Sequence, residues 1–154
     1  PLQRAIKDYM ASGGGVILSG SYLLSDLYHS PIATKEDRLF AEEVLGVKFG
    51  GNMASRDGRI NTKPTKFAGR RIQLSFNTQP SATTYPVESP EIVRPNKKGV
   101  FTALQYATTQ ESAAVAYKGD YSLFIMGFPY ESITDASQRE MLMQDILNWI
   151  TKQP

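Results

Sequence analysis

The chain has 154 residues, of which 41% are hydrophobic and 21% charged, and these values are typical of one globular domain. It contains no cysteine, which excludes disulfides, thiolate metal sites and cysteine nucleophiles. A net charge of +2 gives no support for a nucleic-acid partner, and no apolar run approaches the roughly 20 residues of a membrane span, so we expect neither.

The first third of the chain alternates between helical and strand patterns. Apolar residues at helical spacing predict the helices, and the continuous run Val16-Ile17-Leu18 predicts a strand buried on both faces. Thr34 and Asp37 form a capping pair before the third helix. The predicted elements are a helix over 2–11, a strand over 16–18, a short helix over 21–27, a helix over 34–45 and a strand over 46–50.

The middle of the chain, residues 51–99, is rich in Pro, Thr, Ser and Asn and reads as an irregular insertion with one strand over 71–76. Regular structure returns in the last third. The predicted elements there are strands over 100–107, 113–117 and 121–127, with a hairpin turn at 118–120, and a final helix that begins at a capping pair formed by Asp135 and Gln138.

This order predicts an α/β fold. We expect a three-layer sandwich with a mainly parallel central sheet, an antiparallel hairpin late in the chain and an irregular β-rich insertion, all in a single domain over 1–154. The chain begins at Pro1 within a predicted helix, so we also expect an N-terminal truncation. Ligands of such sheets bind at the carboxyl ends of strands, which here are the turns at 19–21 and 127–131.

The sequences of those two strand ends resemble those of the class I glutamine amidotransferase-like family, which has a flavodoxin-like α/β fold. Its nucleophile turn, roughly P-I-L-G-I-C-x-G, places the cysteine on Ser21 when laid over 16–23, and its second glycine falls on Leu23. The His-Pro-Glu pattern of the family corresponds to Phe128-Pro129-Tyr130-Glu131, which has no histidine. The resemblance therefore implies a degenerate active site without ordinary glutamine hydrolysis.

The whole pattern is most similar to bacterial secreted proteins labelled xanthan lyase-like, over residues 2–49 and 95–150. This resemblance implies a module of a larger carbohydrate-related protein that is secreted or lies at the cell surface or in the periplasm. Its partners would be other domains of the same parent chain. The label describes whole multidomain proteins and does not assign lyase chemistry to this module.

Ser21 is the first candidate catalytic residue, and His29 is the only histidine that could serve it as a base. The alternative is that Ser19 and Ser21 cap the following helix. A single histidine without a cluster of acids is a poor metal site, so we expect no metal and no cofactor.

Asp26 and Glu131 form a second candidate, because both follow predicted strand ends and two carboxylates could perform acid–base chemistry or hold a cation. Glu131 could equally cap the final helix or pair with Arg139.

A third candidate is the basic stretch 56–71, which could bind an acidic oligosaccharide or form a solvated surface. Its candidate ligand-binding residues are Arg56, Arg59, Arg70 and Arg71, to which we add Phe128 and Tyr130, because they bracket Pro129 at the second strand end.

We therefore predict a non-catalytic amidotransferase-like module with a structural or ligand-binding role. The alternative is a hydrolase or carbohydrate-active enzyme that uses Ser21 or the pair Glu131 and Asp26. An exposed apolar face on the first helix would favour a module that mainly contacts its neighbours.

Overall fold

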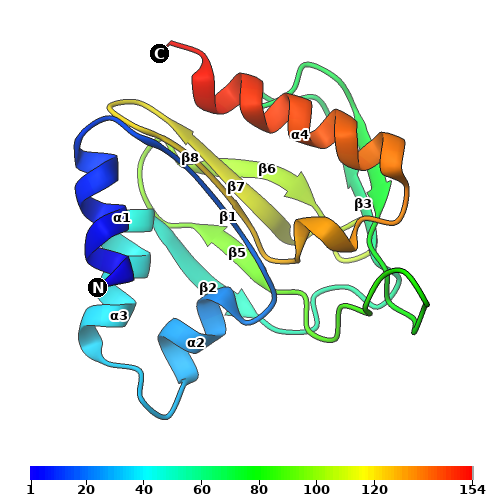
Figure 1. Ribbon diagram of the computed structural model, residues 1–154, viewed down its shortest axis with the longest axis horizontal. Helices are drawn as coiled ribbons and strands as arrows, with labels where there is room; N and C mark the ends of the chain where they lie inside the picture. Colours follow the sequence, from blue (N-terminus) through cyan, green and yellow to red (C-terminus); the bar gives the residue numbers. More distant parts are fainter. Residues whose placement is uncertain (154) are drawn as a thin grey trace.

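The computed structural model describes residues 1–153, in which short helices alternate with strands (Figure 1). The elements are α1 (Leu2–Ala11), β1 (Gly15–Ser19), α2 (Leu23–His29), α3 (Lys35–Leu39), the π-helical segment η1 (Phe40–Leu45), β2 (Val47–Gly51), β3 (Arg59–Thr62), β4 (Ile72–Ser75), β5 (Ile92–Pro95), β6 (Phe101–Gln105), β7 (Ser112–Lys118), β8 (Ser122–Met126), the 3-10 turn η2 (Tyr130–Ser132) and α4 (Ala136–Thr151). Among the helices of these residues, none is long and apolar enough to cross a membrane.

The central sheet has the strand order β1-β8-β7-β6 and is mixed. The pair β1–β8 is parallel, whereas β7–β8 and β6–β7 are antiparallel. The predicted α/β class and the late hairpin are confirmed. We expected a mainly parallel sheet, but parallel pairing is confined to one pair, because the short turns between β6, β7 and β8 allow these consecutive strands to pair only in the antiparallel sense.

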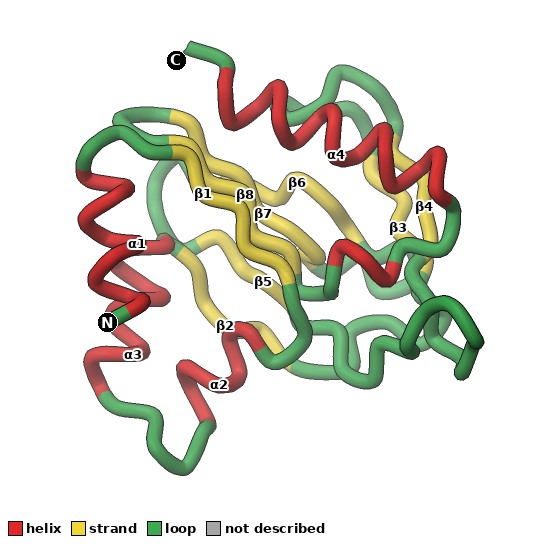
Figure 2. The backbone as a smooth tube through the Cα atoms, in the orientation of Figure 1, coloured by secondary structure: helices red, strands yellow, loops and turns green. Residues whose placement is uncertain are grey.

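Apolar side chains of β8 point alternately into two cores, one on each face of the sheet. Phe124 and Met126 face the core beneath α4, which also includes the β3–β4 hairpin. Leu123 and Ile125 face the core beneath α1, α2 and η1. Figure 2 shows α4 on one side of the sheet and α1 to α3 on the other. The alternation follows from the two-residue period of a strand that is covered on both faces.

Local signals fix the helix boundaries near the start of the chain. Gly13 adopts a left-handed φ of +90° after α1. Thr34 accepts a hydrogen bond from the backbone of Asp37, whose carboxylate accepts one from the Thr34 backbone, so the predicted capping box is present. The helix predicted over 34–45 is interrupted, because its second half widens into η1 and buries Phe40 and Leu45.

The insertion 51–99 forms part of the core. The predicted strand at 71–76 is present as β4 and pairs with β3, and Ile60, Ile72 and Leu74 of this hairpin are buried under α4. Sequence analysis missed β3 and β5, because each has only four residues, and β5 also takes its strand partner, β2, from a distant segment.

Candidate functional site

The two strand ends proposed as a site do meet. Ser19, the last residue of β1, lies opposite Met126, the last residue of β8. Beyond that register the backbone N–H of Tyr130 donates to Ser19 Oγ at 3.3 Å. The turn before α2 and the turn before η2 therefore lie against each other at the carboxyl end of the parallel pair.

The strained residue of the first turn is Tyr22 and not Ser21. Tyr22 has φ 62° and ψ 12°, a left-handed conformation that non-glycine residues rarely adopt. In a nucleophile elbow the reactive residue sits at such a strained turn between strand and helix. The strained position of this turn thus lies one residue after Ser21 and carries an exposed phenol.

Ser21 forms neither of the contacts that its two proposed roles would use. Within residues 1–153 no hydrogen bond of Ser21 Oγ is formed, and His29 instead packs edge-on against Phe49 with ring centroids 5.2 Å apart. The expectation that Ser19 and Ser21 cap α2 is wrong. Ser19 binds Tyr130, and the first turn of α2 is capped from elsewhere in the chain.

The capping group is Glu91, a fully buried side chain that sequence analysis missed. Its two carboxylate oxygens accept the backbone N–H groups of Leu24 at 2.8 Å and Ser25 at 2.9 Å. The negative charge lies at the positive end of the helix, which favours it electrostatically. A lone acid between Pro90 and the apolar start of β5 was the only signal in the sequence.

The backbone of Glu91 joins the same structure to the sheet. Its N–H donates to the carbonyl of Gly127 at 2.8 Å, and its own carbonyl accepts the hydroxyl of the buried Tyr106 at 2.6 Å. Burial, and secondly the nearby Glu91 charge, raise the pKa of Tyr106 above its ordinary value. Glu91 thus connects α2 and β5 to the end of β8 and to Tyr106, which follows β6. These contacts lie at the carboxyl ends of β1 and β8, where we expected a ligand to bind.

Asp26 and Glu131, the proposed acid pair, lie in different surroundings. Asp26 is exposed on α2. Glu131 accepts the hydroxyl of Tyr85 at 2.9 Å, and burial together with this carboxylate raises the pKa of Tyr85 to about 12. Glu131 does not cap α4, because Asp135 accepts the N–H of Gln138 at 2.9 Å as predicted. In the part of the chain that the structure describes, no three acidic or histidine side chains gather as a metal site would require.

Three of the four candidate arginines each bind a different partner within the chain. Arg70 pairs with Asp145 of α4 at 2.5 Å, and Arg71 donates to Asn61 across the β3–β4 hairpin at 3.0 Å. Arg59 pairs with Asp57 at 2.9 Å, while Arg56 is exposed.

Asp57 is the anchor of this region. It accepts hydrogen bonds from Arg59, Ser55 and Thr108, and the bond from the Arg59 backbone is the main cause that lowers its pKa to about 2. The network ties the start of β3 to the turn between β6 and β7.

Phe128, a candidate ligand-binding residue, is not accessible to a ligand. Phe128 is fully buried and stacks on Phe76 with ring centroids 4.7 Å apart and planes at 20°. Tyr130 is half-buried, and its hydroxyl donates to the carbonyl of Arg139 at 2.7 Å. Both aromatic residues therefore hold the second strand end against α4.

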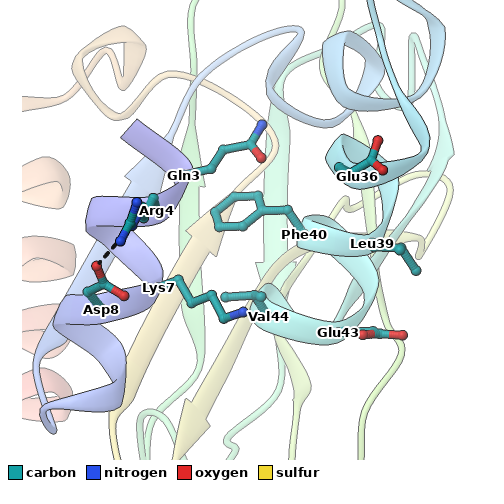
Figure 3. Close-up of a pocket in the computed structure, with 9 residues that line it drawn as sticks. All are labelled: Gln3, Arg4, Lys7, Asp8, Glu36, Leu39, Phe40, Glu43 and Val44. Carbon is teal, nitrogen blue, oxygen red and sulfur yellow. Dashed lines mark ion pairs between the residues drawn. The ribbon is translucent and has the colours of Figure 1, made fainter. Parts of the chain in front are cut away.

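Two cavities lie beside α1. One of about 500 Å³ separates α1 from α3 and η1, and Figure 3 shows Gln3 and Phe40 between these helices. A second of about 470 Å³ is mostly apolar. Its lining comprises Ile6 of α1, Leu18 of β1, Leu23 and Leu27 of α2, and Leu45 of η1, among others.

These features define a mixed α/β module in which the Glu91 carboxylate binds the backbone N–H groups that follow the turn after β1. No family model and no curated protein matches the chain. A solved structure with a similar fold is the exo-beta-1,4-mannosidase Op5Man5 from Opitutaceae bacterium strain TAV5, with a TM-score of 0.54 and 8% identity. The match covers 99% of this chain but only 23% of the mannosidase chain, and at this identity it shows a shared fold alone.

Proposed function

We propose that the chain is a non-catalytic module of a larger carbohydrate-related protein, with a structural or ligand-binding role. The observation that carries this proposal is the buried Glu91 carboxylate, which takes up the N–H groups of Leu24 and Ser25 at the strand-end turn. Those donors are not free for a substrate, and no base is hydrogen-bonded to Ser21 within residues 1–153. A nucleophile without its base loses most of its rate.

Two further observations support the same proposal. Helices and short β-hairpins cover both faces of the sheet, as expected for a degenerate amidotransferase-like module with a three-layer sandwich fold. The similar fold in a mannosidase chain spans a minor part of that chain, which fits a module carried by larger carbohydrate-active proteins. We extend the proposal to a secreted, xanthan lyase-like parent on the sequence resemblance.

A thermal-shift screen tests the proposal with glutamine and a panel of neutral and acidic oligosaccharides. A ligand at 100 times its dissociation constant stabilises the fold by about 2.7 kcal/mol, which is readily measured. We expect a shift with an acidic sugar to be reduced by Arg56→Ala and Arg71→Ala. Neither guanidinium forms an ion pair within the residues described, and the one hydrogen bond lost, from Arg71 to Asn61, is exposed, so we expect both variants to fold.

Hydrolysis of glutamine or of a model ester forms the second arm of the test. We expect no turnover by the wild type above the level of the Ser21→Ala variant. Turnover that Ser21→Ala abolishes while the thermal midpoint is retained would contradict a non-catalytic module and favour the hydrolase alternative.

A further inference from the structure

A pocket of about 350 Å³ lies at the carboxyl-terminal end of α4. Two half-buried aromatic rings line it, Phe101 from β6 and Trp149 from α4, and they meet edge to face with centroids 5.5 Å apart. Small-molecule sites have volumes of this order and combine aromatic lining with a few polar groups. The pocket can therefore accept a ring-shaped ligand against an aromatic surface.

The indole of Trp149 is held in one orientation by contacts within the chain. Its Nε1–H donates to the carbonyl of Tyr117 at 3.1 Å, and Phe67 packs edge-on against the ring with centroids 6.1 Å apart. The ammonium of Lys118 lies 5.4 Å from the ring centroid and donates to backbone carbonyls at the end of α4, including that of Lys152 at 2.7 Å. A surface that is already ordered loses little conformational entropy when a ligand binds to it.

The charge around this pocket is positive. Within residues 1–153 its lining contains Lys66, Lys118 and Lys152 but no acidic side chain, and none of these lysines forms an ion pair. Burial, and secondly the nearby charge of Lys152, lower the pKa of Lys118. Like charges that the chain itself leaves uncompensated favour an anionic ligand.

Two of the three lysines are available to such a ligand. The ammonium of Lys118 is engaged by the end of α4 and by the hydroxyl of Ser122 at 2.8 Å. Lys66 and Lys152 are exposed, and among the residues described their ammonium groups have no hydrogen-bond partner. Lys66 lies in the loop between β3 and β4, within the basic stretch 56–71, so the fold brings a charge from that stretch to the aromatic pocket.

An aromatic surface flanked by free ammonium groups fits a ring that carries a carboxylate. The apolar face of a sugar ring can lie against an aromatic side chain, and an ammonium group binds a carboxylate through charge-assisted hydrogen bonds. A single-stranded nucleic acid uses similar chemistry, but it needs a basic groove that follows the backbone over several nucleotides. One pocket of this size, in a chain of net charge +2, favours a single acidic sugar unit.

We propose that this pocket binds a uronate unit of an acidic oligosaccharide, with the sugar ring against Trp149 and Phe101 and the carboxylate between Lys66 and Lys152. The proposal rests on the ligand-binding role proposed above, for which it names a ligand class and a site. The long side chains of the two lysines hold the carboxylate as point charges, and the fixed rings set the position of the sugar.

Trp149 is the only tryptophan, so its fluorescence reports directly on this pocket. The protein is titrated with uronate disaccharides and trisaccharides, with their methyl esters and with a single-stranded oligonucleotide, and the thermal midpoint is measured in parallel. We expect the uronates to change the emission of Trp149 in a saturable manner. The methyl esters should bind about tenfold more weakly, because they lack the charge that the lysines recognise.

The double variant Lys66→Ala/Lys152→Ala should weaken binding of the uronates by about tenfold or more and leave the thermal midpoint of the free protein unchanged, because both side chains are exposed. Lys35→Ala is the matched control, since Lys35 is also exposed and begins α3, on the opposite side of the sheet from α4 (Figure 2).

Three results would overturn the proposal: wild-type affinity in the double variant, esters that bind as tightly as the acids, or an oligonucleotide that binds more tightly than the uronates. A thermal shift with a uronate that leaves the emission of Trp149 unchanged would also overturn this site, but it would retain a ligand-binding role elsewhere on the module. The absence of both signals for every uronate would remove that role as well and leave a structural one.

Discussion

The buried carboxylate of Glu91 provides a direct test of how the strand-end turn is held. In Glu91→Ala the N–H groups of Leu24 and Ser25 lose their acceptors in a position that the side chain kept free of water. The affected segment is the start of α2, which directly follows the strained residue Tyr22. We expect both global destabilisation and local opening of this helix.

The magnitude follows from the two hydrogen bonds. Bonds to a charged acceptor contribute about 1.5–3 kcal/mol each, which sets an upper limit of about 6 kcal/mol for the pair. The substitution also removes the cost of burying the carboxylate, which offsets part of that loss. We therefore expect Glu91→Ala to lower the free energy of unfolding by about 2–4 kcal/mol. Glu91→Gln retains one acceptor oxygen and should lose about half as much.

Urea unfolding measured by the fluorescence of Trp149, the only tryptophan, gives these free energies. Ser25→Ala is the matched control. The Ser25 hydroxyl is buried in the same place but has no hydrogen-bond partner among the residues described, so its removal should not reduce stability. A loss below about 1 kcal/mol in Glu91→Ala would refute the reasoning, because the two N–H groups would then have other acceptors.

Three further substitutions test other parts of the site. Phe128→Ala should destabilise the fold by about 3–5 kcal/mol in the same urea assay, because the ring is fully buried against Phe76, and a smaller loss would indicate that the ring is accessible. Gly127→Ala should also destabilise, because its Cβ would lie 2.3 Å from the backbone carbonyl oxygen of Glu91, and an unchanged thermal midpoint would contradict that close approach. The lowered pKa of Asp57, about 2 against an ordinary 3.8, means that its charged form stabilises the fold above pH 3.8 and that this contribution is lost as the pH falls toward 2. Asp57→Asn should flatten the dependence of the unfolding midpoint on pH in that window, and an unchanged slope would show that other carboxylates dominate it.

Features specified by neighbouring residues could be predicted from the sequence. The helix over 2–11 matches α1, and the Thr34–Asp37 capping box is present because both partners lie within one turn. The apolar run of β8 and the hairpin before it follow from the two-residue period and a short turn.

Features that depend on distant contacts could not be predicted in the same way. The strands β3 and β5 have few residues, and only their partners β4 and β2 define them. Glu91 is 67 residues from Leu24, whose N–H it accepts. The sequence around Ser21 suggested a nucleophile or a helix cap, whereas a distant carboxylate caps the helix and the strained conformation falls on Tyr22. Phe128 was a candidate ligand-binding residue because nothing local marks its stacking partner Phe76.

One mismatch between the sequence-based prediction and the structure concerns the burial of β1. A continuous apolar run predicts a strand covered on both faces, and such runs occur at 16–18 in β1 and in β8. The prediction holds for β8, whose residues are all buried. In β1, by contrast, Ile17 is 37% exposed and the outer edge is unpaired. Local sequence and global structure usually agree in a natural protein, and a conflict between them tends to mark a functional position.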